Sequence, residues 1–187
     1  EDENVLTWAT KKGPAYPISE SKLEERLGRT KQGMACYYAT STAGTNPEDG
    51  KLYNRKSLFK RLHVVVLDDI GTKVPHETLP EGLEPTYIIE TSAGNFQWGF
   101  VLETPIDNIH QADALIHAVY TSGLSDGGGK LVSKLVRLPC GVNGKVGPYG
   151  DFKVKLIKGD GPRWEPQAML NAMGIDLKWS EVEKDAE

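Results

Sequence analysis

Two strand-like runs joined by a short turn constrain the fold of this chain more than any other feature of its sequence. The runs are PTYIIET (85–91) and FQWGFVLE (96–103), and the turn between them is SAGN (92–95). β-Branched and aromatic residues favour strands, and a short connection that contains glycine favours an antiparallel hairpin. Alternation along the second strand places Trp98 and Phe100 on the face opposite Gln97, where we expect core packing.

Further strands are predicted on both sides of this hairpin. The segments have short apolar or alternating patterns bounded by turn residues: GMACYYAT (33–40), HVVVLDD (63–69), KLVRLP (134–139) and FKVKLI (152–157). The segment LYNRKSLFKRL (52–62) has helical spacing instead. We therefore expect a strand, a helix and a strand between residues 33 and 69.

Two more helices follow the hairpin. In the first, Asp107 or Asn108 is placed to cap the start, and Gly123 is placed to end the helix. The apolar residues between them have helical spacing, and they are Ile109, Ala112, Leu115, Ile116 and Val119. We expect the last helix to start at Pro166 and to end at Gly174. Helices and strands alternate irregularly around a central antiparallel hairpin, which predicts an α+β domain rather than a doubly wound parallel sheet.

Length and composition indicate one ordinary globular domain. We expect residues 1–187 to form a single domain, with its core at 34–174 and an acidic C-terminal tail at 175–187. No segment approaches the roughly 20 apolar residues of a membrane-spanning helix, so we expect a soluble cytoplasmic protein without a membrane partner. Cys36 and Cys140 form neither a CxxC pair nor a Cys/His cluster, so neither a disulfide framework nor a zinc site is indicated.

Charge is distributed unevenly along the chain. The net charge of −4 argues against a protein that coats nucleic acid indiscriminately. Lys and Arg nevertheless concentrate at 51–63 and 130–158, whereas both termini are acidic. A basic segment of this kind is either a solvated face or a phosphate-binding surface.

Adjacent carboxylates end the apolar run HVVVLDDIGTK (63–73). Successive strand residues point to opposite faces, so Asp68 and Asp69 can share a ligand only if the strand bulges or ends there, which Gly71 makes plausible. Hard oxygen ligands without a Cys/His cluster indicate Mg²⁺ or Mn²⁺. The alternative is that Asp69 caps a turn while Asp68 is solvated.

Polar residues also gather at the hairpin turn and in two later glycine-rich loops. Ser92, Asn95 and Gln97 surround the turn, where small residues let a backbone approach a ligand. The segment SDGGGKLVSKLVRLPCGVNGK (125–145) holds a further set: Asp126, Lys130, Lys134, Arg137, Asn143 and Lys145. Such loops suit phosphate or serve as flexible connectors, and the P-loop pattern GxxxxGK[ST] is absent.

In their order along the chain, these three segments resemble the archaeo-eukaryotic primase superfamily, in its branch of RepB-like plasmid and phage primases. Members carry an acidic motif at the end of an apolar strand, a hairpin of the form TSPGxYHxxW, and an acidic residue followed by RxxRLPGxxNxK. The corresponding segments here are VVVLDDIGTK, TSAGNFQWGF and DGGGKLVSKLVRLPCGVNGK, within residues 62–158. The resemblance implies a primase-type fold with a central RRM-like antiparallel sheet flanked by helices.

The resemblance also implies an activity and a site. Asp68, Asp69 and Asp126 would be the catalytic residues and would hold Mg²⁺ or Mn²⁺ in a two-metal mechanism. The implied nucleotide-binding residues are Ser92, Asn95, Gln97, Lys130, Lys134, Arg137, Asn143 and Lys145. The implied reaction is template-directed nucleotidyl transfer by a DNA primase or primase-polymerase of a plasmid or phage. Its partners would be nucleoside triphosphates, a single-stranded DNA template and a replicative helicase.

The chain departs from the family pattern at two positions. Gln97 stands where the family usually has a histidine that contacts the nucleotide phosphates, and Val66 stands where many members have the first Asp of DxD. Glutamine can donate a hydrogen bond to phosphate but cannot be protonated. One alternative is therefore a catalytically degenerate primase fold that serves as a replication initiator or DNA-binding module. Another is a metal-dependent nuclease that uses the same carboxylates.

Overall fold

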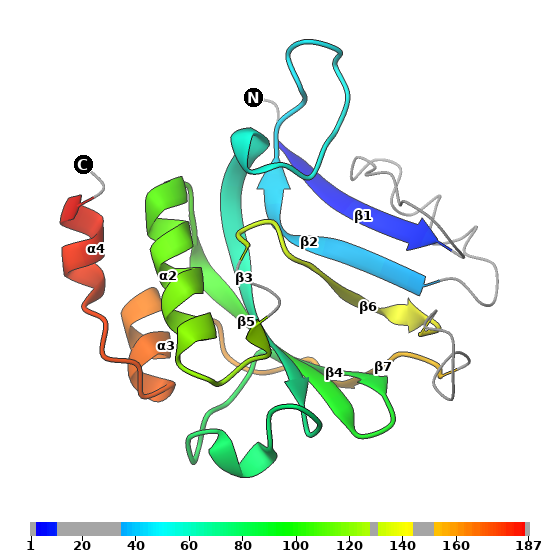
Figure 1. Ribbon diagram of the computed structural model, residues 1–187, viewed down its shortest axis with the longest axis vertical. Coiled ribbons are helices and arrows are strands. Elements are labelled where there is room, and N and C mark those ends of the chain that lie inside the picture. The colour runs from blue at the N-terminus through cyan, green and yellow to red at the C-terminus, as the bar shows by residue number, and fades with distance from the viewer. Residues whose placement is uncertain (1–2, 11–34, 128–130, 144–151, 186–187) are drawn as a thin grey trace.

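The computed structural model describes residues 3–10, 35–127, 131–143 and 152–185 (Figure 1). Its strands are β1 (Asn4–Thr10), β2 (Ala35–Ala43), β3 (Phe59–Ile70), β4 (Tyr87–Ser92), β5 (Asn95–Ile106), β6 (Leu135–Gly141) and β7 (Lys155–Lys158). Its helices are α2 (Ile109–Thr121), α3 (Pro166–Ala172) and α4 (Trp179–Asp185), with short 3₁₀ turns η2 (Lys56–Leu58) and η3 (His76–Thr78). The strands form one sheet in the order β1-β2-β3-β5-β4-β7, and β6 joins it through β2.

Strand β2 changes its partner halfway along, and the sheet forks there. Its C-terminal residues 41–43 pair with the start of β3, whereas 35–39 pair with β6. At the change, the Thr40 amide donates to the Lys134 carbonyl at 3.0 Å. Figure 1 shows β6 running beside β2 while β3 turns away toward β5. The far end of β3 and the strand β6 are therefore not paired, and buried Val64, Val66 and Val136 pack between them.

The main hydrophobic core lies between the β3–β5 part of the sheet and the helices. Helix α2 buries four of the five apolar residues that its spacing predicts, Ala112, Leu115, Ile116 and Val119, together with Tyr120, whereas Ile109 at its start is only partly buried. Phe100 is fully buried and Trp98 packs against the same cluster, so both lie on the face opposite Gln97, as alternation predicts. None of the helices in the described parts of the chain is long and apolar enough to cross a membrane.

The α+β class, the hairpin and two helices are confirmed. Strands β4 and β5 pair with register Ile89↔Gln97 and form the predicted hairpin. The Asn108 side chain caps α2 by accepting from the amides of His110 and Gln111 at 2.9 and 3.3 Å. Helix α3 begins at Pro166 and is followed by Gly174 at φ 68°.

The predicted helix at 52–62 is wrong. Only η2 is helical in this segment, and Phe59, Arg61 and Leu62 belong to β3, where they pair with β2. These pairings satisfy the backbone through residues some twenty positions earlier in the chain, which local spacing does not reveal. The expected strand, helix and strand are therefore two long strands joined by an irregular connection.

The packed region also extends beyond the predicted core limits of 34 and 174. Leu6 on β1 is fully buried in a small cluster with Ala39 and Ala43. At the other end, Trp179 at the start of α4 is only 8% exposed and belongs to the main core, and Val182 packs against it. Part of the acidic tail is thus a helix that covers the core.

Candidate active site

A bulge at the end of β3 brings the two adjacent carboxylates into one pocket. In the ladder with β5, Leu67 pairs with Trp98 and Ile70 with Phe96, so β3 holds one residue more than its partner. Asp69 is the residue of the bulge with positive φ. Its φ of 59° is a left-handed conformation, which Asp tolerates better than most residues do. Alternation is therefore broken, and Asp68 and Asp69 both line the same pocket. The geometric condition for a shared ligand is met.

A glycine lets the carboxylate turn approach the hairpin turn closely. Gly71 has φ 86°, and a Cβ there would lie 2.4 Å from the carbonyl oxygen of Gly94. A side chain would therefore force the two turns apart. On the hairpin side, the Asn95 amide donates to Asp69 Oδ1 at 2.9 Å and its Oδ1 accepts from the Thr72 hydroxyl at 2.9 Å. The two turns are held as one unit.

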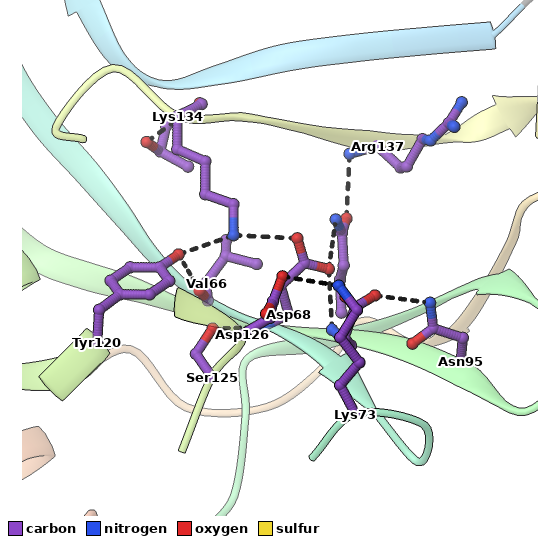
Figure 2. A network of polar contacts seen from close by, with 12 residues as sticks. Val66, Asp68, Lys73, Asn95, Tyr120, Ser125, Asp126, Lys134 and Arg137 are labelled. Carbon is purple, nitrogen blue, oxygen red and sulfur yellow. Dashed lines mark hydrogen bonds and ion pairs between the residues drawn. The ribbon is translucent and has the colours of Figure 1, made fainter. Parts of the chain in front are cut away.

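Asp68 is fixed from three directions (Figure 2). Its Oδ1 accepts from Gln97 Nε2 at 3.1 Å, and its Oδ2 lies 3.0 Å from Lys134 Nζ. Its backbone amide donates to Ser125 Oγ at 2.9 Å. The Asp126 amide donates to the Asp68 carbonyl at 3.3 Å, which ties the loop after α2 to the end of β3. The third predicted carboxylate is brought to the other two in this way.

Lys134 is a buried cation beside Asp68. Its side chain is 12% exposed, and its Nζ donates to the Tyr120 hydroxyl at 2.8 Å. That hydroxyl in turn donates to the Val66 carbonyl at 2.8 Å. Burial alone would lower the pKa of Lys134, but Tyr120 and Asp68 outweigh it and raise this pKa. Lys134 therefore stays charged and holds Asp68 in one orientation.

Lys73 bridges the other two carboxylates. Its Nζ lies 2.8 Å from Asp69 Oδ2 and 2.9 Å from Asp126 Oδ2, although its side chain is 64% exposed. Hydrogen bonds to Asp69 and Asp126 raise the pKa of Lys73 above its ordinary value. Figure 2 shows the Lys73 side chain reaching up from the turn below Asp126.

The oxygen donors suit a hard divalent cation in their chemistry. Asp68, Asp69 and Asp126 offer carboxylate oxygens, which Mg²⁺ and Mn²⁺ prefer. Within the described ranges, no three Asp, Glu, His or Cys side chains are already gathered as the ligands of one ion. Instead, two lysine ammonium groups neutralise the acids. The three carboxylates therefore fit such an ion by type and share one pocket, without forming a ready-made cage.

The opposite wall of the pocket carries a buried arginine. Arg137 on β6 is 6% exposed, its guanidinium lies 4.4 Å from the centre of the Tyr37 ring, and its Nη2 donates to Asn143 Oδ1 at 3.0 Å. Its Nη1 is buried without a hydrogen-bond partner in the described structure. Burial lowers the pKa of Arg137, against the effect of Tyr37 and Asp68, but arginine remains protonated at any ordinary pH. An unsatisfied buried donor on a charged group indicates a missing acceptor.

Gln97 links the two walls. Its Nε2 donates to Asp68, and its Oε1 accepts from the backbone amide of Arg137 at 3.0 Å. Asn143 is held similarly, since its Nδ2 donates to the Thr91 carbonyl at 2.9 Å. The amide side chains thus set the spacing between the carboxylates and the guanidinium.

Most of the predicted site residues meet in this pocket, which has a volume of about 540 Å³. The predicted residues that line it are Asp68, Asp69, Ser92, Asn95, Gln97, Asp126, Arg137 and Asn143. Lys134 reaches it through Asp68, whereas Lys130 and Lys145 lie outside the described residues. The prediction missed the other lining residues, which are Tyr37, Thr72, Lys73, Thr91, Ala93 and Leu135.

Comparisons with solved structures identify proteins that share the fold of this chain. No family model matches the sequence, and no curated protein matches it either. The AEP domain of the primase-polymerase of cyanophage S-2L superposes with a TM-score of 0.64 at 13% identity, over 91% of this chain and 89% of that domain. The catalytic domain of primase RepB′ in complex with initiator DNA gives 0.62 at 16% identity, over 99% and 89%. Another RepB′ structure gives 0.57 at 14% identity, over 99% of this chain and 59% of that one.

The described chain therefore has the fold of a primase catalytic domain. More particularly, its fold is that of the AEP domain of the cyanophage primase-polymerase and of the catalytic domain of primase RepB′. The resemblance seen in the sequence is confirmed at the level of the fold.

Proposed function

We propose that this domain is a template-directed nucleotidyltransferase, a DNA primase or primase-polymerase of a phage or plasmid replication system. The observation that carries the proposal is a single pocket with three carboxylates on one wall and a buried arginine with an unsatisfied donor on the other. Nucleotidyl transfer needs this pairing, because acids bind the metal at the reacting phosphate and cations bind the remaining phosphates.

In the proposed site, Asp68, Asp69 and Asp126 hold Mg²⁺ or Mn²⁺. When bound, such ions lower the pKa of the attacking 3′-hydroxyl and stabilise the charge on the leaving pyrophosphate in a two-metal mechanism. Gln97 and Lys134 keep Asp68 oriented toward the pocket through contacts of 3.1 and 3.0 Å. Asn95 does the same for Asp69.

On the other wall, Arg137 lines the pocket, and its guanidinium supplies a fixed positive charge for the triphosphate. Asn143 and the Tyr37 ring fix the guanidinium plane, so little side-chain freedom is lost on binding. Ser92 lies at the hairpin beside the pocket and offers a further donor. Gln97 has a second amide proton besides the one given to Asp68, and we assign it to a phosphate oxygen. Lys130 and Lys145 complete this proposed set from the basic loops.

The proposed partners follow from the reaction and from the RepB′ complex. RepB′ is seen with initiator DNA, and we propose that this domain likewise binds a single-stranded DNA template. Because the template contacts involve phosphates, binding should weaken steeply with added salt. A replicative helicase, on the same or another chain, would supply the unwound template.

Two observations favour a second candidate, a degenerate primase fold that binds DNA without chemistry. Gln97 replaces the family's histidine, and lysines occupy the space beside all three carboxylates. In that case the domain would bind DNA through its basic segments and would have no metal-dependent activity.

A primer-synthesis assay separates these functions. The domain would be incubated with single-stranded DNA, labelled ribo- or deoxyribonucleoside triphosphates and Mg²⁺ or Mn²⁺. We expect labelled products from the parent and from Asp113→Asn, a surface control outside the pocket, and none from Asp68→Asn or Asp69→Asn. Cleavage of the DNA without synthesis would indicate a nuclease. DNA binding without synthesis or cleavage would indicate the non-catalytic module.

A further inference from the structure

Two lysines neutralise the carboxylates, and they are held in very different ways. Lys134 is buried and bonded to Tyr120 as well as to Asp68. Lys73 lies on the turn after β3, is 64% exposed, and contacts only Asp69 and Asp126 among the described residues. Lys134 is therefore part of the packed structure, whereas the exposed Lys73 ammonium is held at the site by hydrogen-bonded ion pairs with two carboxylates.

The Lys73 ammonium lies between two of the carboxylates that would hold a divalent ion in the proposed site. It lies 2.8 Å from Asp69 Oδ2 and 2.9 Å from Asp126 Oδ2, so one cation joins oxygens from the two turns. Without it, these acids and Asp68 would repel one another across the pocket. A flexible four-carbon stem lets the ammonium leave for solvent without any backbone movement.

We propose that Lys73 is a displaceable internal counter-ion: it holds Asp69 and Asp126 together before metal binds, and the incoming divalent ion replaces it. This inference rests on the proposed metal site. It means that metal binding is a competition, in which the ion must break both contacts of Lys73. The exposed position of Lys73 keeps that competition mild, because exposed ion pairs are weak.

Mn²⁺ binding to the domain without nucleotide tests the competition directly. Free Mn²⁺ would be measured by electron paramagnetic resonance at low salt for the parent, Lys73→Met, Lys73→Arg and Lys178→Met. Lys178 is the matched control, since it is 71% exposed, pairs with Glu181, directly precedes α4 and does not line the pocket. Lys178→Met changes the net charge by the same amount as Lys73→Met.

Lys73→Met should bind Mn²⁺ about three- to tenfold more tightly than the parent, whereas Lys178→Met should stay within about twofold. Lys73→Arg keeps the competing charge and should show no gain. If the parent binds Mn²⁺ and Lys73→Met binds it equally or more weakly, Lys73 is not a displaceable counter-ion. The proposed function is not affected by that result. If Asp68→Asn and Asp69→Asn bind Mn²⁺ as tightly as the parent does, the proposed metal site is wrong, and this inference is wrong with it. Circular dichroism confirms that each variant is folded.

Discussion

Replacing Gln97 with alanine should destabilise the domain strongly even before any substrate is present. The side chain is 6% exposed and makes two hydrogen bonds that join opposite walls of the pocket. It donates to a charged Asp68 oxygen at 3.1 Å and accepts from the buried Arg137 amide at 3.0 Å. Alanine removes both and leaves the Arg137 amide without its acceptor.

The expected loss follows from these two contacts. A hydrogen bond to a charged group contributes about 1.5–3 kcal/mol, and a buried amide left unsatisfied costs about 1–3 kcal/mol. Because the pocket admits water beside the vacated space, we take the lower half of each range, which gives a loss of about 2.5–4 kcal/mol. For a domain of this size, such a loss lowers the melting temperature by roughly 5–15 °C.

Asn95→Ala is the matched control on the same strand. Asn95 also donates to a carboxylate and accepts one hydrogen bond, but it is partly exposed, so water can replace both contacts. We expect a loss of only about 0.5–1.5 kcal/mol. Urea and thermal unfolding of metal-free protein would measure both variants. If Gln97→Ala loses no more stability than Asn95→Ala, the link between the two walls is not what holds Asp68.

Three further predictions concern the same region. Gln97→His introduces the histidine that is usual in the primases which the sequence resembles, and should give equal or better nucleotide transfer, with a pH dependence near the histidine pKa of about 6.5 that the parent lacks; a flat pH profile would contradict this role. Arg137→Met should weaken triphosphate binding at least about tenfold in a calorimetric titration, whereas the exposed control Arg163→Met should not, and equal affinities would remove Arg137 from the phosphate site. A hydrogen bond with the Cys36 thiol lowers the pKa of Cys140 to about 7, although burial acts in the opposite direction. The thiolate fraction of Cys140 therefore rises as the pH rises through about 7. Alkylation of Cys140 should therefore be half-maximal near pH 7, and Cys36→Ala should move this midpoint upward; an unmoved midpoint would show that the thiol contact is not the cause.

Local patterns predicted those parts of the fold that local interactions determine. The hairpin at 85–103 and helix α2 contain their own turn, cap and apolar spacing, and both are found as expected. Residues 52–62 have helical spacing too, but the β2 ladder determines their structure through Phe59 and Leu62. Strand β1 depends on β2 in the same way, with more than twenty residues between them. Pairings of this range leave little trace in a single sequence.

The site residues likewise differ in how much signal the sequence gave for each of them. The carboxylates and Arg137 were found because each stands in a recognisable motif, and the fold brings those motifs together. Lys73 was missed although its i,i+4 spacing from Asp69 was visible in the sequence. Tyr37 gave no signal, because an aromatic residue in a strand is equally expected in a core. Trp179 and Val182 show helical spacing inside the acidic tail, where the charge obscured it.

The fork in β2 also bears on how such a domain can diverge. The carboxylates stand on the β3 arm, which is supported by the helix-covered core, whereas Arg137 stands on the β6 arm. The β1–β2 arm has a small apolar cluster of its own around Leu6. A substitution in the Leu6 cluster can therefore be compensated there, whereas Val64, Val66 and Val136 are buried together between the β3 and β6 arms, so a substitution among them needs a matching change in the other arm.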